Sequence, residues 1–326
     1  MILICKKYKE KNESYEEVVD WLSYNNAQFE FLSGRHHYED GKDWSIELNN
    51  TKDNSSQDFS KYKSVWFRGF LQHNTHLSSI FDTVECSNNN VAELRWRLGQ
   101  EISKTNTQIF NNFKNAFQLP NPKSTKVDKF SNLRLAKNLG LEIPPSIITN
   151  SKNDLKAFFR KHKEIITKPL YETLNFEEDD SFISFKTDKI EESEIYNLPD
   201  TFFPSFFQAY IEKDIELRAF YLEREFYTMA IFSQLDPMTK VDFRNYNEDN
   251  PNRKVPYLLP KEIEEKLKRL MKELNLNTGS IDLIKSPDKK HIFLEVNPTG
   301  QFGFVSKACN YYIEEKIAKT LIKHDS

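Results

Sequence analysis

Two short stretches, residues 280–284 (SIDLI) and 293–298 (FLEVNP), decide the fold of this 326-residue chain. Both alternate apolar with oxygen-bearing side chains, as half-buried β-strands do, and the turn-forming residues between them predict an antiparallel hairpin. Glu295 and Asn297 are two residues apart and so face one side, where the hairpin also brings Asp282. Two carboxylates and an amide oxygen are hard ligands that suit Mg²⁺ with its waters and phosphate oxygens.

A solvent-exposed polar strand face is the alternative interpretation of this hairpin. Against it, Ile281, Leu283, Leu294 and Val296 flank the polar residues. A carboxylate among apolar neighbours needs a partner, and a metal ion would be one. Both interpretations stay open on these residues alone.

The segments outside the hairpin alternate between predicted helices and strands. Strands are predicted over residues 2–5, 64–67, 164–167, 206–211, 217–222 and 226–233, and helices over 90–117, 132–139, 154–162 and near the end of the chain. The order predicts an α+β fold with an α/β N-terminal lobe, whose lobes close on a cleft. Breaks such as Pro120-Asn121-Pro122 predict domains over 1–120, 121–205 and 206–326.

The composition argues against several classes of protein. A net charge of −3 gives no basic field for nucleic acid. No segment approaches the ~20 apolar residues of a membrane span, and the apolar N-terminus is too short for a signal peptide. The three separated cysteines form no CxxC pair, which argues against zinc and suits a reducing compartment. We therefore expect a soluble cytoplasmic protein that binds neither nucleic acid nor membrane.

Several polar residues outside the hairpin are candidates for binding a nucleotide. Lys168 ends an apolar strand and Lys129 precedes a predicted helix, so either ammonium suits phosphates. Gln208, the only amide in the apolar strand 206–211, and the backbone of Tyr210 and Ile211 suit an adenine slot, and Glu216 suits ribose hydroxyls. Surface lysines and a satisfied core glutamine are the structural alternatives.

Two arginines lie at strand-like positions among apolar neighbours. Arg218 and Arg244 have the planar guanidinium group that recognises phosphate or carboxylate. An ion pair with a nearby acid is the alternative for each.

The order of these residues along the chain resembles the ATP-grasp superfamily, from Lys129 to the Glu295-Val296-Asn297 stretch. The resemblance implies a nucleotide held between the central and C-terminal lobes, with residues 1–120 as a pre-ATP-grasp domain. It implies that Lys129 and Lys168 contact phosphates, that Gln208, Tyr210 and Ile211 bind adenine, that Glu216 binds ribose, and that Asp282, Glu295 and Asn297 bind two magnesium ions. Arg218 and Arg244 would stabilise the transferring phosphate.

A narrower resemblance, to the grasp-with-spasm peptide maturases, covers nearly the whole chain. It rests on residues 65–68 (VWFR), 241–246 (VDFRNY), 276–283 (LNTGSIDL) and 293–302 (FLEVNPTGQF). These maturases are related to the microviridin and marinostatin (graspetide) ligases. The resemblance implies an ATP-dependent macrocyclase that turns Asp or Glu side chains of a ribosomal precursor peptide into acylphosphates. Attack by Thr or Ser hydroxyls gives esters, and attack by Lys amines gives amides.

The same resemblance implies partners. They are the leader and core of the precursor peptide, a radical SAM protein with a SPASM domain, and a second copy of the chain in a homodimer. Residues 170–177 after Lys168-Pro169 contain no glycine, unlike the usual phosphate flap, and this segment is a candidate for docking the leader. The acidic residues 177–180 are a second candidate, and Trp66 and Arg68 are candidates for the core-peptide side.

Two other functions fit the same nucleotide residues. One is an ATP-grasp ligase that adds free amino acids to a protein or joins small molecules. The other is a non-catalytic ATP-binding regulatory module. The two kinds of ligase differ in the acceptor that the activated carboxylate joins. Both turn over ATP, whereas the regulatory module only binds it.

Overall fold

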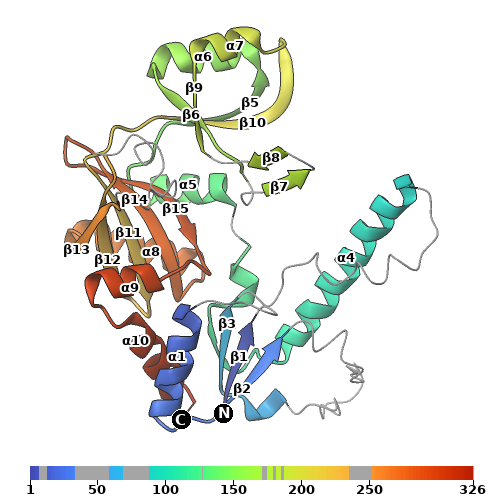
Figure 1. Cartoon of the computed structure of the whole chain (residues 1–326), viewed down its shortest axis with the longest axis vertical. Coiled ribbons are helices and arrows are strands. Elements are labelled where there is room, and N and C mark those ends of the chain that lie inside the picture. Colours follow the sequence, from blue (N-terminus) through green and yellow to red (C-terminus); the bar gives the residue numbers. More distant parts are fainter. Residues whose placement is uncertain are drawn as a thin grey trace. The chain divides into compact units, whose positions relative to one another are not determined.

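The computed structural model describes residues 1–6, 13–33, 59–68, 88–126, 128–170, 175–178, 181–184, 187–234 and 251–325 (Figure 1). The chain forms two compact units. Unit 1 comprises Met1–Thr125 and Tyr312–Ser326, and unit 2 comprises Lys126–Tyr311. The last helix therefore groups with the N-terminal elements, although the prediction places it with residues 206–311. Across the described ranges, no helix has the length and apolar character needed to cross a membrane.

Unit 1 is built on a four-stranded sheet of order β2-β1-β3-β4, in which neighbouring strands are parallel. The strands are β1 (Ile2–Lys6), β2 (Phe29–Ser33), β3 (Ser64–Arg68) and β4 (Phe117–Leu119), and the helices are α1 (Glu13–Tyr24), α4 (Asn88–Asn111) and α10 (Ile313–Lys323). Parallel strands and helices confirm the predicted α/β lobe. The helix predicted over residues 90–117 is wrong at its end, because Phe117 begins a strand that pairs with β3.

The first sheet of unit 2 has the order β5-β10-β6-β9, with antiparallel neighbours. Its strands are β5 (Ser146–Ser151), β6 (Ile165–Thr167), β9 (Asp188–Ile190) and β10 (Thr201–Ala209), with the separate hairpin β7 (Asn175–Glu178) and β8 (Ser181–Ser184). The accompanying helices are α6 (Lys152–His162) and α7 (Glu192–Asn197), whereas α5 (Lys129–Asn138) places Leu133 and Ala136 in the core of the second sheet. Asp128 and Ser151 cap α5 and α6, since each side chain accepts a hydrogen bond from the first turn.

The second sheet of unit 2 has the order β13-β12-β11-β14-β15, again antiparallel. Its strands are β11 (Ile215–Leu222), β12 (Glu225–Phe232), β13 (Arg253–Tyr257), β14 (Thr278–Lys285) and β15 (His291–Asn297), and its helices are α8 (Lys261–Glu273) and α9 (Gly303–Cys309). Leu267, Leu270 and Met271 of α8 join the core that covers one face of this sheet. The other face carries the site described next.

Candidate active site

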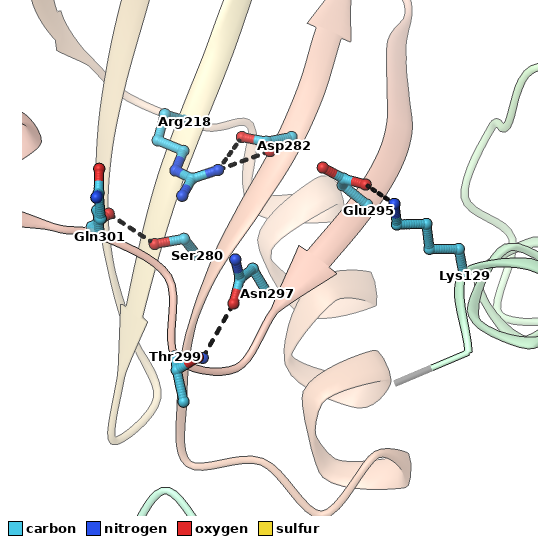
Figure 2. A network of polar contacts seen from close by, with 8 residues as sticks. All are labelled: Lys129, Arg218, Ser280, Asp282, Glu295, Asn297, Thr299 and Gln301. Atoms are coloured by element: carbon cyan, nitrogen blue, oxygen red, sulfur yellow. Dashed lines mark hydrogen bonds and ion pairs between the residues drawn. The ribbon is translucent and has the colours of Figure 1, made fainter. Parts of the chain in front are cut away.

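Polar side chains cross three neighbouring strands on one face of the second sheet (Figure 2). Arg218 of β11, Asp282 of β14 and Glu295 of β15 are directly opposite one another, and Ser280 is opposite Asn297. The residues between them belong to the hydrophobic core: Leu217, Ala219, Ile281, Leu283 and Val296. Strand alternation therefore separates a polar face from a core face. The predicted juxtaposition of Asp282, Glu295 and Asn297 is confirmed.

A β-bulge in β15 keeps these two faces apart. Asp282 pairs with Glu295, and the next residue, Leu283, pairs with Phe293, so Leu294 is an extra residue. In a regular strand Phe293 and Glu295 would face the same side. The bulge allows Phe293 to be fully buried in the core while Glu295 lies with the polar residues.

Each carboxylate of the hairpin has a cation beside it. Arg218 Nη1 donates to both oxygens of Asp282, at 2.7 and 2.6 Å. Lys129 Nζ lies 3.9 Å from Glu295 Oε2 and donates to the carbonyl of Pro169 at 3.1 Å. The side chains of Lys129 and Glu295 are 25% and 22% exposed, so this pair is accessible to a ligand. The site thus combines two carboxylates with two cations that suit phosphate groups.

The turn after β15 holds Asn297 in place. Asn297 Oδ1 accepts a hydrogen bond from Thr299 N at 3.1 Å, and Ser280 Oγ donates to the carbonyl of Gln301 at 3.1 Å. Gly300 packs so closely here that an added Cβ would lie 2.4 Å from Cβ of Ser280. The close approach therefore requires glycine, and the turn fixes the amide next to the carboxylates.

The donor set fits Mg²⁺ bound together with a phosphate ligand. In the part of the chain that the structure describes, no three or more His, Cys, Asp or Glu residues gather closely enough to hold a metal ion. Asp282 and Glu295 therefore need Asn297, water and phosphate oxygens to complete a coordination shell, which is how Mg²⁺ commonly binds. Arg218 Nε is buried and has no hydrogen-bond partner among the described atoms, which is compatible with an anion that the structure does not contain.

The candidate adenine residues lie where β10 ends. Gln208 is 1% exposed, and its Nε2 donates to Ser146 Oγ at 2.9 Å, so it has a protein partner in the core. The strand predicted over residues 206–211 is wrong at its end, because β10 stops at Ala209. Tyr210 N instead donates to the carbonyl of Glu164 at 2.9 Å, and burial raises the pKa of the Tyr210 hydroxyl. Tyr210 and Ile211 thus belong to the connection that leads into β11.

Glu216 lies in a buried polar cluster. Its Oε1 accepts hydrogen bonds from Lys213 Nζ and Ser233 Oγ, each at 2.6 Å. All three residues are buried, with Ser233 fully so. The candidate residues of the sequence do not include Lys213 or Ser233. The one feature of the sequence that could have indicated this cluster is Lys213, which stands three residues before Glu216 at the start of an apolar strand.

The remaining candidates lie elsewhere. Lys168 follows β6, with its ammonium 5.7 Å from the ring centroid of Phe206. Trp66 and Arg68 are buried in unit 1, where the guanidinium lies 5.9 Å from the Trp66 ring. Arg244 lies outside the described residues, as do residues 179 and 180 and the side chains of 177 and 178.

An apolar pocket of about 320 Å³ lies in the first sheet of unit 2. It is lined by Thr167, Ile190, Glu194, Leu198, Phe202, Phe203, Ser205 and Phe207. Phe203 is 85% exposed, which is unusual for such a large apolar side chain. The pocket is therefore a second candidate binding feature, formed by β6, β9, β10 and the segment at α7.

Comparison with known proteins identifies the fold. No protein-family model matches the sequence, and no curated protein matches it significantly. A RiPP-associated ATP-grasp ligase from Chryseobacterium gregarium, solved with ADP and a leader and core peptide, is 23% identical with a TM-score of 0.80, covering 99% of this chain and 96% of that chain. The macrocyclase MdnC from Microcystis aeruginosa MRC, bound with precursor peptide MdnA, has the same identity and TM-score over 99% and 100% of the chains.

A third solved structure agrees with these two. The ATP-grasp ligase PsnB, complexed with minimal precursor, Mg and ADP, is 15% identical with a TM-score of 0.78 over 100% and 97% of the two chains. Likeness at this level of identity establishes architecture along the full length of the chain. The protein therefore has the ATP-grasp fold.

Proposed function

We propose that this protein is an ATP- and Mg²⁺-dependent ligase that closes rings in a ribosomally made precursor peptide. The observation that carries the proposal is the row of Arg218, Asp282 and Glu295, with Asn297 and Lys129 beside it. The proposal is supported by three structures of the same fold, which are described as ligases or macrocyclases bound to leader, core or precursor peptides.

The reaction starts from a carboxylate, which is a poor electrophile. Transfer of the γ-phosphoryl group of ATP to an Asp or Glu side chain of the peptide gives an acylphosphate and ADP. A Thr or Ser hydroxyl, or a Lys amine, then forms a bond to the acyl carbon as the bond to phosphate breaks, and the attacking group loses its proton. Such catalysis rests mainly on positioning and on neutralising charge.

The residues of the hairpin face supply that neutralisation. Asp282, Glu295 and Asn297 would hold two magnesium ions, which when bound shield the triphosphate charge. Lys129 and Lys168 hold phosphate oxygens, and Arg218 and Arg244 stabilise the transferring phosphoryl group. Gln208, Tyr210 and Ile211 hold adenine, and Glu216 holds the ribose.

This mechanism needs no covalent nucleophile from the enzyme. The two cysteines that the structure describes have properties that agree with this. Cys5 and Cys309 are free and buried. Burial raises the pKa of the Cys309 thiol to about 11 and raises the pKa of Cys5 as well. Both thiols are therefore protonated at neutral pH, and the thiol is not the nucleophilic form.

The apolar pocket supports a docking place for the leader part of the peptide. It offers a hollow next to the exposed ring of Phe203, on a sheet separate from the carboxylate row. Phe203→Asp should weaken binding of the precursor peptide at least tenfold by calorimetry, because a charge in an apolar contact loses its hydration. Tyr196→Asp is the control, since Tyr196 is also exposed but does not line the pocket. Equal effects of the two changes would place the leader elsewhere, for example at residues 177–180.

The finer parts of the proposal concern context. The cytoplasmic location follows from the composition, and the homodimer and the radical SAM partner with a SPASM domain follow from the sequence resemblance. The two free thiols, Cys5 and Cys309, support a reducing compartment. Sedimentation of the purified protein tests the dimer, and co-purification with the product of a neighbouring radical SAM gene tests the partner.

Mass spectrometry of the peptide encoded beside this gene, after incubation with enzyme, ATP and Mg²⁺, tests the main proposal. The expected product has lost one water per ring, and omission of ATP should abolish the loss. A mass gain equal to an amino acid would instead support ligation of free amino acids. An unchanged peptide with ATP still bound would support the regulatory module.

A further inference from the structure

The cluster of Lys213, Glu216 and Ser233 contains a charged pair that is almost removed from water. The side chains of Lys213 and Glu216 are 2% and 9% exposed, and their charged atoms are 2.6 Å apart. Ser233 Oγ donates to the same carboxylate oxygen, and Gln234 Nε2 donates to Ser233 Oγ at 3.2 Å. The contacts from Lys213 and Ser233 both reach Oε1 of Glu216, and they help to fix the orientation of the carboxylate group.

Backbone hydrogen bonds fix the chain before and after Lys213. The connection from β10 to β11 is tied at its start, where Tyr210 N donates to the carbonyl of Glu164, and at its end, where Asp214 N donates to the carbonyl of Lys285. Each of these hydrogen bonds is 2.9 Å long. Lys213 thus enters the cluster from a short segment with two fixed ends.

Stability alone does not account for this pair. Moving an ammonium and a carboxylate out of water costs several kcal/mol each, and an apolar pair of similar size is often as stable. What the pair does provide is a carboxylate held in one rotamer, with an ammonium group against one of its oxygens. A hydroxyl donates a stronger hydrogen bond to an ionised oxygen than to a neutral one.

We propose that Lys213 is a positioning residue, which orients Glu216 toward the sugar hydroxyls of the nucleotide and so sets the preference for ribonucleotides over deoxyribonucleotides. The inference rests on the proposed function, in which Glu216 holds the ribose. It assigns to Lys213 and Ser233 a role in sugar recognition, and it assigns them no contact with the reacting atoms.

The test compares the affinities of ATP, 2′-deoxy-ATP and 3′-deoxy-ATP for the full-length protein by calorimetry. The wild type should prefer ATP over at least one deoxy analogue by about tenfold or more, the scale of one hydrogen bond to a charged group. Lys213→Met should bring this ratio close to one, and Lys213→Arg should restore part of it. A purely structural role would weaken all three nucleotides equally and leave the ratio unchanged.

Lys268→Met is the matched control. Lys268 pairs with Glu265 across the same spacing, i and i+3, at 2.9 Å on the surface of α8. The Lys268→Met variant should keep the wild-type ratio of ATP affinity to deoxy-ATP affinity. If Lys213→Met fails to fold, Ser233→Ala removes the second contact and should lower the ratio in the same direction.

The outcomes separate this inference from the proposed function. A wild type that binds no ATP would overturn both. A wild type that makes rings and prefers ATP, with an unchanged ratio in Lys213→Met and Ser233→Ala, would overturn the inference alone. A wild type that does not distinguish the three sugars would also overturn it.

Discussion

The hairpin face of β11, β14 and β15 and the connection from Gln208 to Glu216 hold their polar groups in opposite ways. On the hairpin face, Glu295 and the neighbouring Lys129 are partly exposed, and their charged atoms are 3.9 Å apart. A phosphate group can therefore take the place of Glu295 beside the Lys129 ammonium. At the two ends of the connection, Gln208 of β10 and Glu216 of β11 are buried. Gln208 is hydrogen-bonded to the neutral Ser146, and Glu216 is paired with the charged Lys213. The first region is arranged for exchange of ionic partners, and the second for fixed hydrogen bonds.

The largest effect is expected from the two carboxylates of the hairpin face. Asp282→Asn and Glu295→Gln keep the shape and remove the charge, and each should lower the turnover number about 100- to 1,000-fold, as loss of a group that stabilises the transition state does. Ring formation followed by mass spectrometry measures this. Asp288→Asn, in the turn of the same hairpin and 58% exposed, is the control and should leave turnover unchanged. If Asp282→Asn and Glu295→Gln each lowered the turnover number tenfold or less, the hairpin face would be no more important for turnover than the connection.

The next effect concerns stability rather than turnover. Arg218→Met leaves Asp282 in a site that is only 15% exposed, without the guanidinium that now balances its charge. Loss of a partner from a mostly buried pair should cost about 2 to 4 kcal/mol, measured by urea unfolding. The double variant Arg218→Met with Asp282→Leu should recover at least half of that loss. Additive costs in the double variant would show that the pair does not couple the two residues.

A smaller effect is expected in the connection. Gln208→Leu keeps the apolar strand and removes the amide, so the affinity for ATP should fall about tenfold, while affinity for GTP changes less. Ser146→Ala is the control, because it removes the partner of Gln208 and leaves the amide in place. If Gln208→Leu weakens ATP and GTP to the same degree, Gln208 is a core residue only.

The smallest effect is the pH dependence of stability at the far end of the hairpin. Burial, with a smaller contribution from Lys285, lowers the pKa of His291, whose Nε2 lies 2.9 Å from the Tyr257 hydroxyl. The unfolded chain therefore takes up a proton before the folded chain as the pH falls. Stability from this residue is present above the unfolded pKa and is lost below it. His291→Gln should flatten the fall in melting temperature between pH 7 and pH 5.5, and an unchanged slope would contradict this.

The two regions also differ in how far the sequence predicts them. The juxtaposition of Asp282 with Glu295 was predictable, because a short turn separates the two strands and the polar residues of each strand are two positions apart. The cluster around Glu216 was not, since Ser233 reaches it only through the pairing of β11 with β12. The end of β10 was misjudged because Tyr210 and Ile211 continue the apolar pattern while the backbone leaves the sheet.

The other error has a similar physical cause. Phe117 fits the helical pattern of α4, but its backbone pairs with Ser64 of β3. Tertiary pairing decides such positions, and local pattern does not contain it. The strands predicted over residues 217–222 and 226–233 overlap β11 and β12, because each is a long apolar stretch that ends at the turn residues 223–225.

The bulge at Leu294 has a consequence for how this strand tolerates changes in length. Removing one residue from a regular strand turns every later side chain to the opposite face. Here Leu294 is the extra residue, so its deletion would leave Phe293 in the core and Glu295 on the polar face, now in strict alternation. The strand therefore contains one position at which a single-residue deletion changes its twist without exchanging inside and outside.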